Sequence, residues 1–353
     1  MIALTWMSHR YVLAAFSAFF LYILSASLRG VSNLQSSLHL HLGGVTAHNE
    51  YAYIANATTQ ELQASYDEAF NISDFGTMGE RVSEFSSLAH STVADPTIDR
   101  APLLALLRKY FPWWQPRPAT YTPWQHSASD PLGTTGIVIC VGSSNLIYAM
   151  HTVLSLRNVL HSKLPIQIAY GGDSDLSFSD RVAITDLGSD IETLNVRDYF
   201  DEEIAGLHDG GWAMKPFAML ASRFQKTIVL DADAVFVRSP DQLFQTEPGL
   251  VETGTLFWHD RAFDAKPEGR HAWIRDVMGH RQPSAMLNQS LFWQKSIFHE
   301  MDSAALCMDK GRPNVFMSLL FSCWMNTRRV RDEITYQHVH GELLLKRLGP
   351  HLV

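Results

Sequence analysis

The stretch that decides the fold is residues 227–236, TIVLDADAVF. Its first part, Thr227 to Leu230, is an apolar run of strand length, which is typical of a strand buried on both faces. Asp231 and Asp233 follow at once. Two carboxylates two residues apart at the end of such a strand can reach one hard divalent cation, directly or through water. The segment therefore predicts a buried strand that ends in a candidate metal site.

The same pattern of letters occurs once more, at residues 173–175, where the chain reads Asp-Ser-Asp. This second motif follows the glycine pair Gly171-Gly172 instead of an apolar run. We interpret it as a solvated turn, because acidic residues next to glycines are typical of turns. Context, and not the motif itself, separates the two.

Alternating strands and helices precede the first motif. Apolar strand-like runs occupy residues 136–141, 165–170 and 191–196. Gly142-Ser143-Ser144 interrupts the first run and offers an N-cap to a helix with apolar residues at helical spacing. Residues 215–223 indicate a further helix, with proline in its first turn. This order predicts an α/β fold with a mostly parallel central sheet and a ligand at the carboxyl edge of its strands.

Two enzyme classes place Asp-x-Asp after an apolar strand. In a phosphatase of the haloacid dehalogenase type, Asp231 would be the phosphorylated nucleophile and Asp233 the acid or base. In a nucleotide-sugar transferase, a nucleotide-binding half precedes the metal motif. Nearly a hundred residues of predicted sheet precede Asp231, and this order favours the transferase. The phosphatase remains the third hypothesis, after the two readings of the transferase given below.

Three blocks of this sequence resemble the fungal α-1,3-mannosyltransferase family, glycosyltransferase family 71. They begin GIVICVGSSN, GWAMKPFAML and GTLFWHDRAF, and together they cover about residues 136–264. The resemblance implies a GT-A fold in the Golgi. It also implies transfer of mannose from GDP-mannose to an α-mannoside of a glycoprotein glycan, with Mn²⁺ as cofactor, an α-1,3 linkage and retention of configuration.

The resemblance also assigns roles to residues near the metal motif. Asp231 and Asp233 would bridge Mn²⁺ to the diphosphate, and Val141, Gly142 and Ser143 would form the edge that faces the nucleotide. These assignments come from matching positions in the three blocks.

Further roles follow from the same matching. Lys215 would direct its cation toward the phosphates; the alternative is a solvated lysine at a helix start, because a cation opposes the helix dipole there. Asp260 and Arg261 would hold donor sugar or acceptor, with a structural ion pair as the alternative. Asp302 would line the sugar pocket, in a segment that the family follows with a lysine, which is Lys310 in this chain. Ala304 stands where the family has glycine.

The carboxyl-terminal part departs from the family pattern. His340 is a candidate third metal ligand. After Gly341 the family continues with an acid-Lys-acid triplet and an aromatic segment, whereas this chain reads ELLLKRLG from Glu342. We therefore expect residues 131–353 to be a C-terminally incomplete GT-A-like domain that binds GDP-mannose and transfers mannose poorly. The alternatives are an inactive GDP-mannose-binding pseudo-enzyme and a truncated gene product.

The first residues predict a membrane anchor. Residues 11–28 carry no charge and are long enough to span a bilayer, so we expect a single-pass type II membrane protein with a cytoplasmic tail at 1–10. A cleaved signal peptide is the alternative. Residues 29–130 would form a lumenal stem and a collar rich in Pro and Trp, whose tryptophans we expect to pack and not to bind sugar. Sequons at Asn56, Asn71 and Asn288 predict glycosylation.

Composition excludes several classes of protein. The net charge is −8 and charged residues make up 18 %, so the chain offers no basic stripe for a nucleic acid. Three cysteines allow one disulfide at most, which excludes a disulfide scaffold. An apolar fraction of 46 % supplies ample material for a core and excludes disorder over the whole length.

Overall fold

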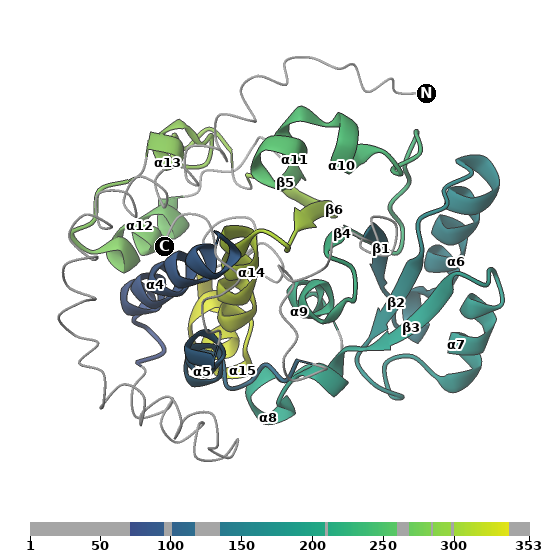
Figure 1. The fold of residues 1–353 in the computed structure, drawn as a ribbon, viewed down its shortest axis with the longest axis horizontal. Coiled ribbons are helices and arrows are strands. Elements are labelled where there is room, and N and C mark those ends of the chain that lie inside the picture. Colours follow the sequence, from purple (N-terminus) through teal and green to yellow (C-terminus); the bar gives the residue numbers. More distant parts are fainter. Residues whose placement is uncertain are drawn as a thin grey trace.

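A six-stranded mixed sheet forms the centre of the molecule (Figure 1). The computed structural model describes residues 71–94, 101–116, 135–208, 211–259, 268–283, 285–297 and 300–338. The order of strands across the sheet is β3-β2-β1-β4-β6-β5. Their bounds are Thr135–Cys140 for β1, Ile166–Tyr170 for β2, Ile191–Asn195 for β3, Lys226–Leu230 for β4, Thr255–Trp258 for β5 and Asp302–Asp309 for β6.

Four of these strands are parallel, as the sequence predicts. In the register, Ile139 of β1 lies beside Leu230 of β4 and beside Ile168 of β2. The chain runs from β1 outward to β2 and β3, then returns past β1 to place β4 on its other side. The point between β1 and β4 is therefore the topological switch point of the sheet, where open α/β sheets bind their ligands.

The other two strands were not predicted as part of the sheet. β6 is antiparallel to β4, with Leu230 beside Ala305, and β5 is antiparallel to β6. β5 consequently runs in the same direction as β4, so both end at the carboxyl edge, and β6 begins there. The sheet is mixed with mostly parallel strands.

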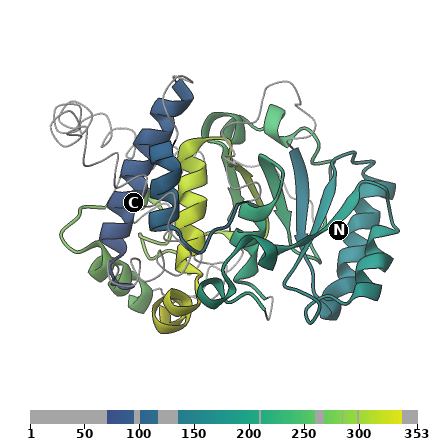
Figure 2. The same ribbon diagram turned by 60° about the horizontal axis from the view of Figure 1, so that its bottom comes forward.

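Helices cover both faces of the sheet (Figures 1 and 2). On one face lie α6 (Leu146–Leu154), which continues as a π-helical turn to Val159, α7 (Phe178–Thr185), α10 (Leu243–Thr246) and α11 (Pro248–Thr253). On the other face lie α4 (Phe75–Ala94), α5 (Ala101–Tyr110), α9 (Met214–Ala221) and α14 (Pro313–Met325). The remaining described helices are α8 (Glu202–Ala205), α12 (Glu268–Met278), α13 (Ala285–Gln289), α15 (Arg328–Val330), α16 (Tyr336–His338) and short turns at 143–145, 196–199 and 331–335.

Each face of the sheet has its own hydrophobic core. Ile137 and Ile139 of β1 pack with α6, whereas Val138, between them, packs with α9 and α14. The continuous apolar run that marks β1 in the sequence is thus used on both faces, because successive side chains of a strand point to opposite sides.

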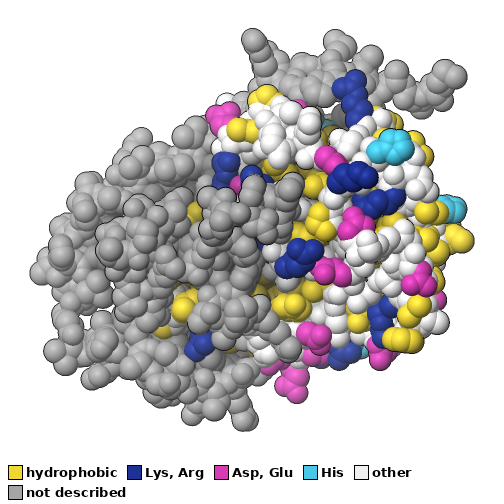
Figure 3. Space-filling model, turned by 45° about the vertical axis from the view of Figure 1, so that its right-hand side comes forward, with side chains coloured by type: hydrophobic (Ala, Val, Ile, Leu, Met, Phe, Trp, Pro, Cys, Tyr) yellow, Lys and Arg dark blue, Asp and Glu magenta, His cyan; other side chains and the backbone are white. Residues whose placement is uncertain are grey.

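Charges of both signs are mixed on the surface. On the face drawn in Figure 3, lysine and arginine side chains lie interspersed with aspartate and glutamate side chains. Several opposite charges form ion pairs at exposed positions, such as Arg223 with Glu192 and Arg329 with Glu333. Pairs of this kind contribute little to stability, so the two hydrophobic cores hold the fold together.

The predicted stem is wrong where the structure describes it. Phe75, Met78, Val82 and Phe85 of α4 are buried in the core that includes α14, and Phe75 contacts Trp324 with 5.0 Å between the ring centroids. The apolar spacing of three and four residues in α4 is a helical signal, which the prediction of a stem overlooked. Residues 71–116 therefore belong to the same folded body as the sheet, and the predicted boundary at residue 130 does not divide it.

The collar tryptophans bear out their predicted packing role in part. Trp113 and Trp114 are buried, and Trp113 contacts Phe217 of α9. Trp124 lies outside the described residues, as do the predicted tail at 1–10, the predicted anchor at 11–28 and Asn56. No helix in the described ranges is long and apolar enough to cross a membrane. No disulfide joins Cys140, Cys307 and Cys323, all of which the structure describes.

Candidate functional site

The carboxyl edge of the sheet gathers most of the predicted site residues. β4 leads into Asp231 and Asp233, and β1, next to it, leads into Val141, Gly142 and Ser143. β6 starts at this edge with Asp302. The antiparallel strand β6 is what brings Asp302 to the edge, and no local pattern in the sequence indicates that direction.

Asp231 is held by a buried cation. Its carboxylate forms an ion pair with the ammonium group of Lys215, in the first turn of α9. The Lys215 side chain is only 5 % exposed and the Asp231 side chain is 29 % exposed. The backbone of the same region is fixed too, because the Asp231 N–H donates to the Ala304 carbonyl at 2.9 Å and Lys215 Nζ donates to the Ser303 carbonyl at 3.4 Å.

The burial of Lys215 excludes the solvated lysine that the sequence left open. A charge in such a place is tolerated only when an opposite charge and hydrogen bonds compensate the lost hydration. Asp231 supplies that charge, so Lys215 fixes the position of this carboxylate. Its predicted contact with phosphates stays a prediction.

Asp233 differs from Asp231 in being exposed to solvent. Thr152, a buried residue of α6, anchors the loop between Asp231 and Asp233. It lies on the face of the sheet opposite to α9, which carries Lys215. The Thr152 hydroxyl lies 2.7 Å from the Ala232 carbonyl, to which it donates, and 3.1 Å from that of Ala234. Thr152 was not predicted as part of the site. Only the fold brings it to the loop, 80 residues further along the chain.

Hydrogen bonds hold the turn after β1, but the side-chain N-cap predicted from Gly142-Ser143-Ser144 is not formed. The residue before α6, Asn145, does not cap that helix with its side chain; instead its Oδ1 accepts the Gly142 N–H at 2.9 Å. Ser143 Oγ donates to Asp180 Oδ2 at 2.5 Å, and this bond is the largest cause of a lowered pKa at the Asp180 carboxyl. Val141 is buried, whereas Gly142 and Ser143 are accessible at the edge of the sheet.

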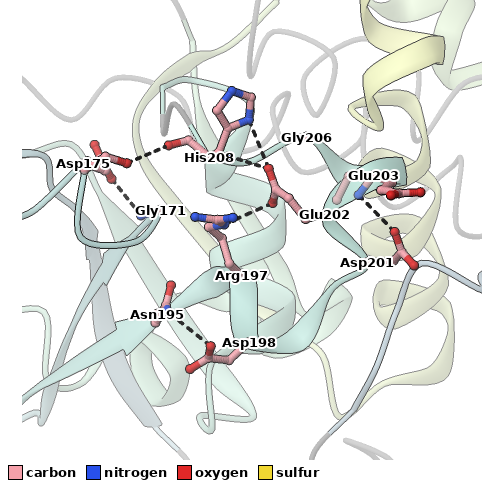
Figure 4. Close-up of polar contacts among 12 residues, drawn as sticks. Gly171, Asp175, Asn195, Arg197, Asp198, Asp201, Glu202, Glu203, Gly206 and His208 are labelled. Carbon is pink, nitrogen blue, oxygen red and sulfur yellow. Dashed lines mark hydrogen bonds and ion pairs between the residues drawn. The ribbon is translucent and has the colours of Figure 1, made fainter.

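The two carboxylates of the second Asp-x-Asp motif, Asp173 and Asp175, differ in their burial. Asp173 is 84 % exposed and pairs with Arg181 at 2.7 Å, which agrees with a solvated turn. Asp175 does not agree, because it is half-buried and accepts the Gly171 N–H at 2.7 Å (Figure 4). Desolvation raises its pKa above the ordinary value, against the lowering effect of that hydrogen bond.

The predicted sugar-pocket residues are placed only in part. Asp302 pairs with Trp258, the last residue of β5, and accepts the Ala304 N–H at 2.9 Å. Asp260 and Arg261 follow β5 in the sequence but lie outside the described residues, as does His340. Asn71 and Asn288 are both exposed, and their glycosylation stays a prediction.

Lys310 does not line a sugar pocket. β6 runs antiparallel to β4, so its last residue, Asp309, lies beside Lys226 at the opposite edge of the sheet. Lys310 is fully buried there and donates to the carbonyls of Met219 (2.9 Å), Leu220 (3.1 Å) and Ser222. It caps the carboxyl end of α9, whose amino end carries Lys215. Burial lowers the pKa of Lys310 to about 7.

The donor set at the β4 edge suits a hard cation. Within the described ranges, no three His, Cys, Asp or Glu side chains are gathered closely enough to hold a metal ion. Asp231 and Asp233 nevertheless provide carboxylate oxygens at the edge of the sheet, both open to solvent, as Mg²⁺ or Mn²⁺ requires when a diphosphate and water supply the other ligands. The residues present fit a metal that is shared with a ligand.

A sequence comparison decides the family. The profile described as "Mannosyltransferase putative" matches residues 134–342, which is more than half of the chain. The chain belongs to this mannosyltransferase family. The match contains the four parallel strands, both Asp-x-Asp motifs and Lys215, and its last residue is Glu342, where the sequence departs from the pattern of the resembling family.

Curated relatives are more distant, and the chain spans about a quarter of their length or less. The "Putative alpha-1,3-mannosyltransferase MNN12" of Candida albicans is 25 % identical over 215 residues, which cover 50 % of this chain and 26 % of that protein. The α-1,2-mannosyltransferase MNN24 of C. albicans is 36 % identical over 106 residues, 28 % of this chain and 14 % of that protein. The α-1,2-mannosyltransferase MNN2 of Saccharomyces cerevisiae is 28 % identical over 137 residues, which cover 37 % of this chain and 22 % of that protein.

Among solved structures, the galactosyltransferase LgtC in complex with donor and acceptor sugar analogs is similar with a TM-score of 0.37 and 14 % identity. The similarity covers 60 % of this chain and 68 % of LgtC. The family assignment rests on the sequence and not on this likeness. Membership of this family favours a glycosyltransferase over the phosphatase hypothesis.

Proposed function

We propose that this family member transfers mannose from GDP-mannose to an α-mannoside of a glycoprotein glycan, with retention of configuration, on a GT-A fold. The observation that carries the proposal is the pairing of Asp231 with the buried Lys215 at the switch point between β1 and β4. Support comes from the family, from the exposed Asp233 two residues on, and from the fixed backbone of the turn after β1. The metal expected at the two aspartates is Mn²⁺.

In this proposal the protein's own groups work by positioning. Asp231 and Asp233 would hold Mn²⁺, which when bound neutralises charge on the departing diphosphate. Lys215 keeps Asp231 in one place, and Thr152 fixes the backbone that links the two carboxylates. Both supports come from inside the fold, so the Asp231 carboxylate and the backbone that leads to Asp233 need not reorganise when the donor binds. Asp302, Asp260 and Arg261 remain the proposed contacts to the sugars.

The bond formed is proposed to be an α-1,3 linkage. The relatives carry names with both α-1,3 and α-1,2 linkages, so the chemical identity of the product is the informative readout. The test is incubation of the chain with radiolabelled GDP-mannose, Mn²⁺ and an α-mannobioside, followed by NMR of the product. We expect an α-1,3-linked mannose. An α-1,2 product would correct the linkage, and release of free mannose alone would contradict the transfer.

The expected weak activity calls for a binding measurement beside the transfer assay. Asp233→Asn should abolish transfer, whereas Asp173→Asn, an exposed aspartate in the other motif, should not change it. Mn²⁺-dependent binding of GDP-mannose without any transfer would support the pseudo-enzyme instead. Absence of both would refute the proposed function.

We further propose that the protein is a single-pass type II protein of the Golgi membrane with this domain in the lumen. The exposed sequon asparagines Asn71 and Asn288 support the proposal, since a glycan needs a surface position. Glycosidase treatment of the protein from its native host should increase its mobility on a gel. No mobility change, or recovery of the protein in the cytosol, would contradict it.

A further inference from the structure

Asp175 carries a carboxylate that the proposed mechanism does not use. It stands in the turn after β2, where its Oδ2 accepts the Gly171 N–H at 2.7 Å and its own N–H donates to the Gly172 carbonyl at 3.0 Å. In the described part of the chain, its second oxygen, Oδ1, forms neither a hydrogen bond nor an ion pair. One oxygen of this half-buried carboxylate is therefore available to accept a hydrogen bond from a ligand.

The cations close to this turn are already engaged. Arg181 pairs with the exposed Asp173 at 2.7 Å. Arg197 packs against Gly172, yet Figure 4 shows it turned toward Glu202, with 3.3 Å between Arg197 Nε and Glu202 Oε2. Among the described residues, no cation offsets the desolvation that raises the Asp175 pKa. Asp175 is a negative group prepared for a donor that the described protein does not supply.

Asp175 also lies against the turn expected to face the nucleotide. A Cβ atom at Gly142 would come within 2.6 Å of Asp175 Oδ1, so glycine is what allows the carboxylate to lie at this turn. The Ser143 N–H donates to the Asp175 carbonyl at 2.8 Å and ties the two turns together. The unused oxygen thus lies next to the backbone of Gly142, at the carboxyl edge of the sheet.

The spacing of the strands agrees with a nucleotide whose base lies next to Asp175. The order β2-β1-β4 puts the end of β2 two strands from the end of β4, which is about 10 Å at the usual strand separation. A diphosphate at Asp231 and Asp233 would be separated from its base by a ribose. The base of a nucleotide that extends along the edge, past β1, would then arrive at Asp175.

On the basis of the proposed function, we infer that Asp175 selects guanine by accepting hydrogen bonds from its N1–H and N2 amino groups. Guanine presents two adjacent donors, which Oδ1 and the remaining lone pair of Oδ2 can accept while Oδ2 keeps the Gly171 N–H. Uracil presents one N–H between two carbonyls, and adenine presents an acceptor at N1, so either base would set lone pairs against the carboxylate. Asp175 is a specificity residue for the donor, distinct from the metal ligands.

The test changes both the residue at position 175 and the base of the nucleotide. Xanthine has a carbonyl where guanine has the 2-amino group, so it repels a carboxylate but accepts from an amide. Calorimetry with Mn²⁺ should show that the wild-type chain binds GDP about 10- to 100-fold more tightly than xanthosine diphosphate, the range for one bidentate pair. Asp175→Asn should reverse the order. The asparagine oxygen can still accept the Gly171 N–H, so the turn is expected to keep its structure.

Asp173→Asn, two residues away, is the matched control and should keep the wild-type ratio. Equal affinity of the wild-type chain for the two nucleotides, or an equal loss of both in Asp175→Asn, would overturn the inference and leave a structural role for Asp175. These results leave the proposed function standing, because the metal-dependent binding of a diphosphate persists. Binding of neither nucleotide to the wild-type chain would refute the inference together with the proposed function.

Discussion

The turns after β4 and after β2 contain the same Asp-x-Asp pattern and use it in opposite ways. After β4, the first aspartate pairs with a buried lysine and the second is exposed. After β2, the first is exposed and pairs with Arg181, whereas the second is half-buried and has no cation among the described residues. The residues packed behind each turn, and not the motif, determine what its carboxylates can do. Both turns lie at one edge, on either side of β1.

The largest effect is expected at Asp231. Asp231→Asn removes the carboxylate charge that pairs with the buried ammonium group of Lys215, and breaking a buried pair costs about 3 kcal/mol or more. Urea unfolding should show this loss, and Mn²⁺-dependent binding of GDP-mannose should disappear. The matched change Asp173→Asn alters a carboxylate that is 84 % exposed, while its partner Arg181 keeps its hydrogen bond to the Leu176 carbonyl, so the loss should stay within about 1 kcal/mol of the wild type. A similar loss of unfolding free energy in the two variants would contradict the proposed difference between the turns.

Removal of both partners sharpens this comparison. Lys215→Met combined with Asp231→Asn removes both charges of this ion pair, so the double variant should be more stable than Asp231→Asn alone. The difference is expected to be about 1–3 kcal/mol, the usual range for coupled neighbours. A double variant as unstable as the sum of the two single variants would mean that Lys215 and Asp231 do not stabilise each other.

The two ends of α9 provide another contrast, because Lys215 has a carboxylate partner and Lys310 has carbonyls. The folded pKa of Lys310 is about 7, below 10.5 for the unfolded chain. Between these values the unfolded state binds the extra proton, so this group makes stability rise with pH, by up to about 1.4 kcal/mol per unit. Lys310→Met should remove that rise, and Lys163→Met, on the surface, should not. Equal slopes in both variants would contradict the assignment.

The sequence predicted those elements of the fold that carry a local signal. It did not predict those that depend on contacts between residues far apart in the chain. The parallel strands β1 to β4 and α9 were predicted because each carries its own local signal, an apolar run or a helical spacing. α4 was missed because serines and threonines surround its apolar positions, so the wrong boundary was drawn. The place of Lys310 required the direction of β6, which depends on pairing with β4 and leaves no local mark.

The site shows the same division. Asp231 and Asp233 could be named from the strand that precedes them, since a metal motif is local. Thr152 and Asp175 could not, because their roles depend on contacts with residues far along the chain or in another turn. Burial of Lys215 was equally invisible, since the dipole argument favoured solvent. The sequence identifies the groups that can do chemistry, and the fold decides which of them meet.

A small effect on stability is expected at Gly142, where the two turns touch. In Gly142→Ala the new methyl group would lie 2.6 Å from Asp175 Oδ1, and the end of a side chain can rotate away. We expect a loss below about 1 kcal/mol, because surface changes of this kind are mild. The preference for GDP over xanthosine diphosphate should nevertheless decrease, as measured by calorimetry. A full preference in this variant would show that the position of Asp175 does not matter.

The central claim is that the turn after β4 binds a metal and a diphosphate, and that the turn after β2 does not. Calorimetric titration of GDP-mannose into the chain, with Mn²⁺ and with EDTA, tests it most directly. We predict saturable binding with Mn²⁺ that vanishes with EDTA and in Asp233→Asn, yet persists in Asp173→Asn. Binding that is equally strong with EDTA, or in Asp233→Asn, would contradict the account.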